Sequence, residues 1–135
     1  MSEMVVRDVK LNDDDLLFVN EPACGSGAML IALAQTFLAK KVNLSQVVFV
    51  GQDVDDRCAA MAHLQLSLLG LNAIVTVGDT LRMTQSDCFY TPAYFMNSMP
   101  FRIRRWELKK AQDKAFAERQ RVLHNMVSQA IAGAR

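Results

Sequence analysis

A glycine-rich turn stands between an apolar run and a helical pattern near the start of this 135-residue chain. Residues 16–20 predict a short buried strand, and residues 21–27 form the turn Glu-Pro-Ala-Cys-Gly-Ser-Gly. Residues 28–40 then have helical spacing and end in lysine, which suits a helix C-terminus. In open α/β sheets this order of elements holds nucleotide-like ligands, because glycine leaves backbone N–H groups bare and lets a ligand approach closely.

Strands and helices alternate in the next part of the chain. Residues 47–50 and 73–77 are β-branched or aromatic runs that predict two more strands, and residues 57–69 predict a helix between Asp55 or Asp56 and Gly70. Such alternation with short links predicts a parallel sheet. Beyond residue 80 we expect at most one short strand, around residues 93–96, and a mostly helical segment over 102–132.

Composition narrows the class of protein. The chain is 51% hydrophobic and 21% charged, as expected of a soluble globular domain. No apolar run reaches the length of a membrane span and no signal peptide opens the chain, so we expect a cytoplasmic protein without a membrane segment. The three cysteines lack CxxC spacing, which argues against a disulfide framework and a metal site.

Charge divides the chain unevenly. Residues 1–101 carry six basic and eleven acidic side chains, whereas residues 102–135 carry nine basic and three acidic ones. A basic segment of this kind either meets nucleic acid or is a solvated helix packed against the acidic body, and the sequence leaves both readings open.

Two well-known glycine loops do not fit the turn. A phosphate-binding P-loop ends in Gly-Lys-Ser/Thr, but Ala28 and Met29 follow the last glycine here. A dinucleotide-binding fingerprint requires a small residue three places after Gly27, where this chain has Leu30. A nucleotide- or NAD-binding domain therefore fits the predicted fold but not the loop.

The turn instead resembles motif I of the DNA adenine-N6 methyltransferases, an Asp/Asn-Pro-x-Cys-Gly-Ser-Gly loop that holds S-adenosylmethionine (SAM). The likeness is strongest to the modification subunits of type I restriction systems and their small phage and plasmid relatives, with Glu21 in place of the usual Asp. It covers roughly residues 16–97 and implies a Rossmann-like SAM-dependent methyltransferase fold over residues 1–101, followed by a basic helical tail over 102–135. With three firm strands, the parallel sheet is expected to be incomplete or truncated.

The resemblance also implies a cofactor site. Asp53, at the tip of the second strand in Gly51-Gln52-Asp53, would accept hydrogen bonds from the ribose hydroxyls. Val54 would lie against the adenine face and Asp79 near the adenine amine, although either acid alone could be a plain helix N-cap. The full predicted set for SAM comprises Asn20, Glu21, Pro22, Ala23, Gly25, Gly27, Asp53, Val54, Asp79 and Thr80.

A catalytic loop is harder to find. The family carries Asp/Asn-Pro-Pro-Tyr/Phe after its fourth strand, and the nearest match is the segment Asn97-Ser98-Met99-Pro100-Phe101, which has one residue too many and a serine for the first proline. By resemblance, Asn97 and Pro100 would accept the protons of the adenine amine, and Phe101 would stack on the flipped base. The alternative is an ordinary loop.

Two functions therefore stay open. One is SAM-dependent adenine-N6 methylation of DNA in restriction-modification, by this chain or by an enzyme of which it is a part. The other is a catalytically degenerate SAM-binding module that acts through partners or DNA. An incomplete sheet leaves an apolar edge, so we expect a homo-oligomer or a partner subunit, with the basic tail as the DNA contact.

Overall fold

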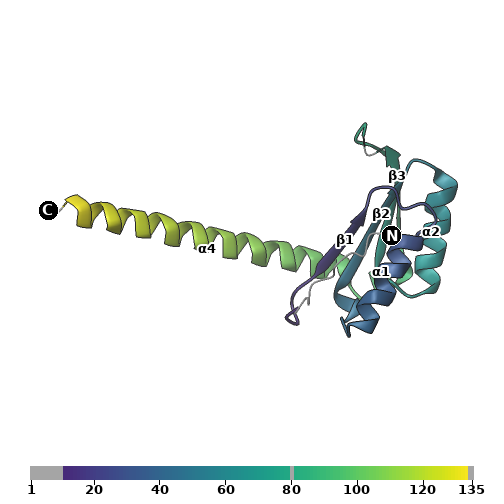
Figure 1. Cartoon of the computed structure of the whole chain (residues 1–135), viewed down its shortest axis with the longest axis horizontal. Coiled ribbons are helices and arrows are strands. Elements are labelled where there is room, and N and C mark those ends of the chain that lie inside the picture. Colours follow the sequence, from purple (N-terminus) through teal and green to yellow (C-terminus); the bar gives the residue numbers. More distant parts are fainter. Residues whose placement is uncertain (1–10, 80, 134–135) are drawn as a thin grey trace. The chain divides into compact units, whose positions relative to one another are not determined.

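A computed structural model describes residues 11–79 and 81–133 of the chain. The chain divides into two compact units, of which the first ends at Pro100 and the second begins at Phe101. The elements are β1 (Leu17–Glu21), α1 (Ala28–Ala39), the short 3-10 helix η1 (Leu44–Gln46), β2 (Val47–Asp53), α2 (Asp56–Leu68), β3 (Ala73–Asp79), β4 (Thr84–Tyr90), α3 (Pro92–Met96) and α4 (Met99–Gly133). The first unit holds one four-stranded sheet in the order β1-β2-β3-β4 (Figure 1).

The first three strands pair in parallel, so their carboxyl ends meet at one edge of the sheet. Glu21 lies opposite Gly51, and Asp53 lies opposite Val77. This pairing confirms the parallel sheet and the α/β class that the alternation of strands and helices predicted. It also brings the chain segments that follow β1, β2 and β3 to the same edge.

Helices α1 and α2 cover one face of this sheet (Figure 1). Their buried side chains interlock with alternate residues of the strands, because successive strand side chains point to opposite faces. The resulting core contains Leu30, Leu33, Ala34, Phe37, Val47, Phe49, Ala59, Ala62, Leu66, Ala73, Val75 and Val77, among others. The central strand β2 is buried on both faces, which explains its continuous apolar run.

The ends of α2 follow the expected signals. Asp55 is the N-cap, and its side chain accepts a hydrogen bond from the Arg57 N–H at 2.9 Å. Gly70 follows the last turn with a φ of 68°, a left-handed conformation that glycine adopts without strain. The helix therefore stops where the sequence predicted.

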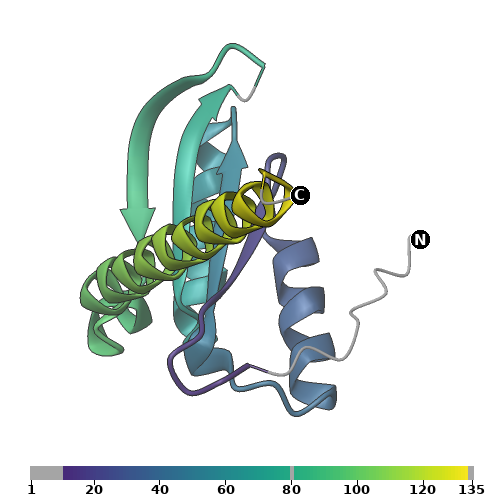
Figure 2. The ribbon, with the colours of Figure 1, turned by 90° about the vertical axis from the view of Figure 1, so that its left-hand side faces the viewer.

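The expectation of a strand around residues 93–96 was wrong. These residues belong to α3, which begins at Pro92 because proline suits the first turn of a helix. The fourth strand is β4 instead, and it runs antiparallel beside β3, with Tyr90 opposite Ile74 (Figure 2). Its sequence, Thr-Gln-Ser-Asp-Cys-Phe-Tyr, gave no strand signal because most of this edge strand is exposed and lacks apolar alternation.

The long helix α4 confirms the helical segment predicted over residues 102–132 and begins slightly earlier, at Met99. From Glu107 to Gly133 its residues are exposed. Among the described residues, no helix is long and apolar enough to cross a membrane.

The fully buried Thr91 supplies a test of how β4 and α3 are attached to the sheet. Its hydroxyl donates to the Leu71 carbonyl at 2.7 Å and accepts from the Ala73 N–H at 2.9 Å. We expect Thr91→Val to lower the free energy of unfolding in urea by about 1–3 kcal/mol, because two buried backbone groups lose their partner. Thr91→Ser keeps the hydroxyl and should lose less. Equal stability of the valine variant and the unmodified protein would contradict this role.

Candidate functional site

The Asp53 carboxylate lies at the carboxyl edge of the sheet and connects two loops. One oxygen accepts a hydrogen bond from the Gly25 N–H at 2.9 Å, and the other accepts from the Asp55 N–H at 2.9 Å. Asp53 thus ties the glycine turn after β1 to the start of α2. Asp55, not Asp53, is the helix N-cap, so Asp53 is not a plain cap.

The glycine turn is held in place mainly by backbone contacts. The Cys24 N–H donates to the Gln52 carbonyl, and the Gly27 N–H donates to the Cys24 carbonyl, both at 2.9 Å. Gly27 precedes α1 with a φ of 92° and offers no side chain to cap the helix. The first-turn N–H groups of α1 therefore face the turn without a side-chain cap, which is the arrangement that attracts anionic ligand groups.

Two glycines are required by close packing or by backbone conformation. A Cβ on Gly51 would lie 3.1 Å from both the Cβ and the Sγ of Cys24, so a side chain at position 51 would push the turn out of place. Gly25 has a φ of 53°, and a Cβ built there would meet nothing within 4 Å. The backbone at Gly25 is thus open to a ligand.

Gln65 of α2 is a supporting residue that the sequence analysis missed. Its Nε2 donates to the Ser26 carbonyl at 3.0 Å and so holds the glycine turn against α2. Ala62, one helical turn earlier, lies 3.4 Å from the position a Cβ would take on Gly27. The sequence signal that could have indicated this contact is a small residue and an amide three positions apart on α2.

At the tip of β3, the Asp79 carboxylate organises a turn. One oxygen accepts from the Leu81 N–H at 2.9 Å, and the other lies 3.6 Å from the Arg82 Nε. Val54, at the tip of β2, is 69% exposed. Both side chains are at the edge where the sequence placed them.

The remaining predicted cofactor residues lie in or next to the turn. The Glu21 carboxylate accepts from the Ala23 N–H at 3.2 Å, while Asn20, Pro22 and Ala23 are exposed. Thr80 falls outside the described residues. The structure thus brings the described members of the cofactor set, from β1, β2 and β3, to one edge of the sheet.

Asn97 is not brought to this edge. Its Nδ2 donates to Asn72, just before β3 begins, and the amide of Asn72 donates in turn to the Leu44 and Val47 carbonyls at 3.2 Å. Because β3 has seven residues, Asn97 lies roughly 20 Å from Asp79, at the opposite edge of the sheet.

The backbone of the same segment does not match the family's catalytic loop. Ser98 has a φ of 53°, whereas proline is restricted to about −65°, so the missing first proline could not occupy this position. Pro100 is exposed in the first turn of α4. Phe101, which begins the second unit, is 70% exposed. The catalytic role of Asn97, Pro100 and Phe101 stays a prediction that the geometry does not support.

Cys24 is buried in the glycine turn, and its thiol ionises less readily than a free cysteine. Burial, and after it the negative charge of Asp53, raise the pKa of the Cys24 thiol from 9.0 to about 11. The thiol therefore stays protonated at neutral pH and packs as a small apolar group. Within the parts of the chain that the structure describes, no cluster of three or more His, Cys, Asp or Glu side chains is arranged to hold a metal ion.

Comparison with known proteins places the chain in a family. Residues 1–132 match the N-6 DNA methylase family. The chain is also 35% identical over 92 residues to the methylase subunit of the type I restriction enzyme MjaVIII from Methanocaldococcus jannaschii. That match covers 66% of this chain and 15% of the relative, so the chain spans a small part of that protein's length. No solved structure matches the chain.

The raised pKa of Cys24 predicts a pH dependence of stability. In the unfolded chain the thiol ionises near pH 9, but in the folded protein it ionises near pH 11, so the stabilisation is complete below pH 9 and is lost as the pH rises. At pH 10 we expect a loss of about 1.4 kcal/mol relative to pH 8. Cys24→Ala should lack this component when urea unfolding is measured at both pH values. A full loss in the alanine variant would show that other groups cause it.

Proposed function

The chain belongs to the N-6 DNA methylase family, and from that premise we propose that the carboxyl edge of its sheet binds SAM for adenine-N6 methylation of DNA. The proposed site consists of the glycine turn, the tip of β2 and the tip of β3. Its members are Asn20, Glu21, Pro22, Ala23, Gly25, Gly27, Asp53, Val54, Asp79 and Thr80.

The observation that carries this proposal is the position of the Asp53 carboxylate. Each of its oxygens accepts one backbone N–H, from Gly25 or from Asp55. A carboxylate has about four lone-pair directions, so both oxygens keep the capacity to accept a hydroxyl proton. A ribose presents two adjacent hydroxyl donors, which suits a fixed pair of acceptors at the end of a parallel strand.

The glycine turn suits the methionine end of the same ligand. The N–H groups at the start of α1 have no side-chain cap and favour a carboxylate. The Glu21 carboxylate stands beside the turn and offers a counter-charge for an ammonium group. Val54, largely exposed at the tip of β2, provides an apolar contact for the adenine ring.

SAM supplies an electrophilic methyl group when it is bound, and the residues of this chain hold and orient it. Methyl transfer also needs hydrogen-bond acceptors for the adenine amine within about 3–3.5 Å of the reacting atoms. Asn97 is too far from Asp53 and Asp79 to serve within one chain, so we leave it, Pro100 and Phe101 out of the proposed site. We infer that a partner subunit or another segment supplies these acceptors, as the 15% coverage of the restriction methylase subunit allows.

DNA contact through the basic helix α4 is a second part of the proposal. Residues 102–121 contain eight of the nine basic side chains that follow residue 101. Exposed lysines and arginines bind DNA phosphates and release counterions, so affinity should fall steeply as salt rises. This proposed DNA contact, together with the membership of a methylase family, favours a cytoplasmic protein.

A degenerate module that binds SAM without transferring the methyl group is the alternative. The position of Asn97 and the conformation of Ser98 favour it for the isolated chain. The two functions share the cofactor site and differ only in chemistry, so separate measurements distinguish them.

Cofactor binding is tested by calorimetry with SAM and S-adenosylhomocysteine. We expect binding by the unmodified protein and at least tenfold weaker binding by Asp53→Asn, because a charged acceptor of two hydroxyls is worth roughly 1.5–3 kcal/mol. Asp56→Asn, in the exposed first turn of α2, is the matched control and should bind as the unmodified protein does. Absence of heat with both ligands at millimolar concentration would overturn the proposal.

Chemistry is tested by transfer of tritium from labelled SAM to adenine-containing DNA. We expect little or no transfer by the isolated chain, since Asn97 lies at the far edge of the sheet. Asn97→Ala should then leave SAM binding unchanged. Robust transfer that Asn97→Ala abolishes would show that this residue is catalytic and that the loop moves to the cofactor.

A further inference from the structure

Gln65 of α2 holds one peptide group of the glycine turn. Its Nε2 donates a hydrogen bond to the Ser26 carbonyl at 3.0 Å. At the other end of the same peptide group, the Gly27 N–H donates to the Cys24 carbonyl at 2.9 Å. A peptide group is planar, so two hydrogen bonds at its two ends fix its orientation. The peptide that leads into α1 is therefore fixed from both sides.

Ala62 supports the turn next to this hydrogen bond. It is fully buried, and its Cα and Cβ lie 3.4 Å from the position that a Cβ would take on Gly27. Residues three positions apart lie on one face of a helix, so Ala62 and Gln65 meet the turn from the same side. Gly27 has a φ of 92°, which glycine adopts without strain. Helix α2 thus supports the turn at two adjacent points.

The preceding peptide groups of the turn are ordered in sequence with this one. The Gly25 N–H donates to the Asp53 carboxylate at 2.9 Å, which holds the peptide before Gly25. The peptide between Gly25 and Ser26 therefore lies between one group held by Asp53 and one held by Gln65. Its N–H and the uncapped N–H groups at the start of α1 are the donors that an anionic ligand group would meet.

We propose that Gln65 is a positioning residue of the cofactor site. Its amide orients the glycine turn for the methionine carboxylate of SAM, and it acts through the Ser26–Gly27 peptide, not by contact with the ligand. This inference rests on the proposed cofactor function. The adenosine half of the ligand would depend on other groups, at the tips of β2 and β3. Loss of the Gln65 hydrogen bond should therefore weaken only those ligands that carry the amino-acid end.

Gln65→Met removes the donor with little change in shape. Methionine is unbranched, is of similar length and favours a helix about as well as glutamine. Gln35→Met is the matched control, because Gln35 is exposed on α1. Gln65→Glu is a second variant of similar shape, and its carboxylate places an acceptor opposite the Ser26 carbonyl.

Calorimetry of the full chain with two ligands is the primary test. S-adenosylhomocysteine carries the amino-acid end, whereas methylthioadenosine has the adenosine half alone. We expect Gln65→Met to raise the dissociation constant of S-adenosylhomocysteine about fivefold and that of methylthioadenosine less than about twofold, because one hydrogen bond to the turn is lost. Gln35→Met should bind both ligands as the unmodified protein does.

The outcomes separate this role from the cofactor site itself. Equal weakening of both ligands, or of neither, would overturn the positioning role and leave the site intact. Failure of the unmodified protein to bind either ligand would overturn the proposed function as well. If Gln65→Met does not fold, Gln65→Glu decides, since it should show the same difference between the two ligands.

Exchange of backbone N–H groups, measured by NMR, reports on the turn without any ligand. We expect Gln65→Met to speed exchange of the Gly27 N–H about threefold or more relative to the Asp55 N–H, which donates to Asp53. Unchanged exchange at Gly27 would contradict the fixed peptide. This measurement also decides the case in which methylthioadenosine binds too weakly for calorimetry.

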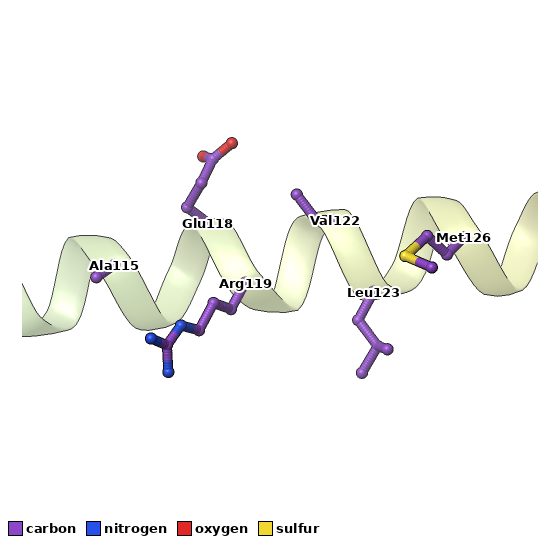
Figure 3. Close-up of a pocket in the computed structure, with 6 residues that line it drawn as sticks. All are labelled: Ala115, Glu118, Arg119, Val122, Leu123 and Met126. Carbon is purple, nitrogen blue, oxygen red and sulfur yellow. The ribbon is translucent and has the colours of Figure 1, made fainter.

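A shallow groove on α4 needs a control of its own. It is lined by Ala115, Glu118, Arg119, Val122, Leu123 and Met126, all in the second unit (Figure 3). Glu118 and Arg119 project to opposite sides of the helix in this view. Leu123→Ala alters this groove alone and should leave binding of S-adenosylhomocysteine unchanged. Weaker binding by this variant would place the ligand on α4 and overturn the role of Gln65.

Discussion

The carboxylate of Asp53 connects the glycine turn after β1 to the start of α2 at the carboxyl edge of the sheet. It accepts the Gly25 N–H from one side and the Asp55 N–H from the other. Without it, the glycine turn would keep its backbone contacts to Gln52 and its contact to Gln65, but not its connection to the start of α2. A parallel sheet makes this possible, because it delivers the ends of β1 and β2 to the same place.

The carboxyl and amino edges of the sheet differ in how their polar side chains are bonded. At the carboxyl edge, the carboxylates of Asp53 and Asp79 accept hydrogen bonds from the backbone of the adjoining loops. At the amino edge, the buried side chains of Asn72 and Thr91 bond to backbone groups, and Asn97 bonds to Asn72. The hydrogen bonds of these buried polar groups are made within the fold, as buried polar groups require. The edge that attaches α3 is therefore stabilised by the very asparagine that resembles a catalytic residue.

The chain belongs to the N-6 DNA methylase family. The sheet carries the proposed cofactor site, while Asn97, the predicted acceptor for the adenine amine, bonds to Asn72 at the opposite edge. Helix α4 adds exposed apolar and basic surface to an acidic first unit.

The sequence by itself determined the parallel strands, the two covering helices, the glycine turn and the family, because these depend on local periodicity and on a contiguous motif. Only the tertiary structure decided where polar strand β4 pairs, since an exposed edge strand has no apolar signal. It also decided the place of Asn97. Position along the chain suggested that Asn97 lies at the carboxyl edge, but the antiparallel direction of β4 carries the following segment back to the opposite edge.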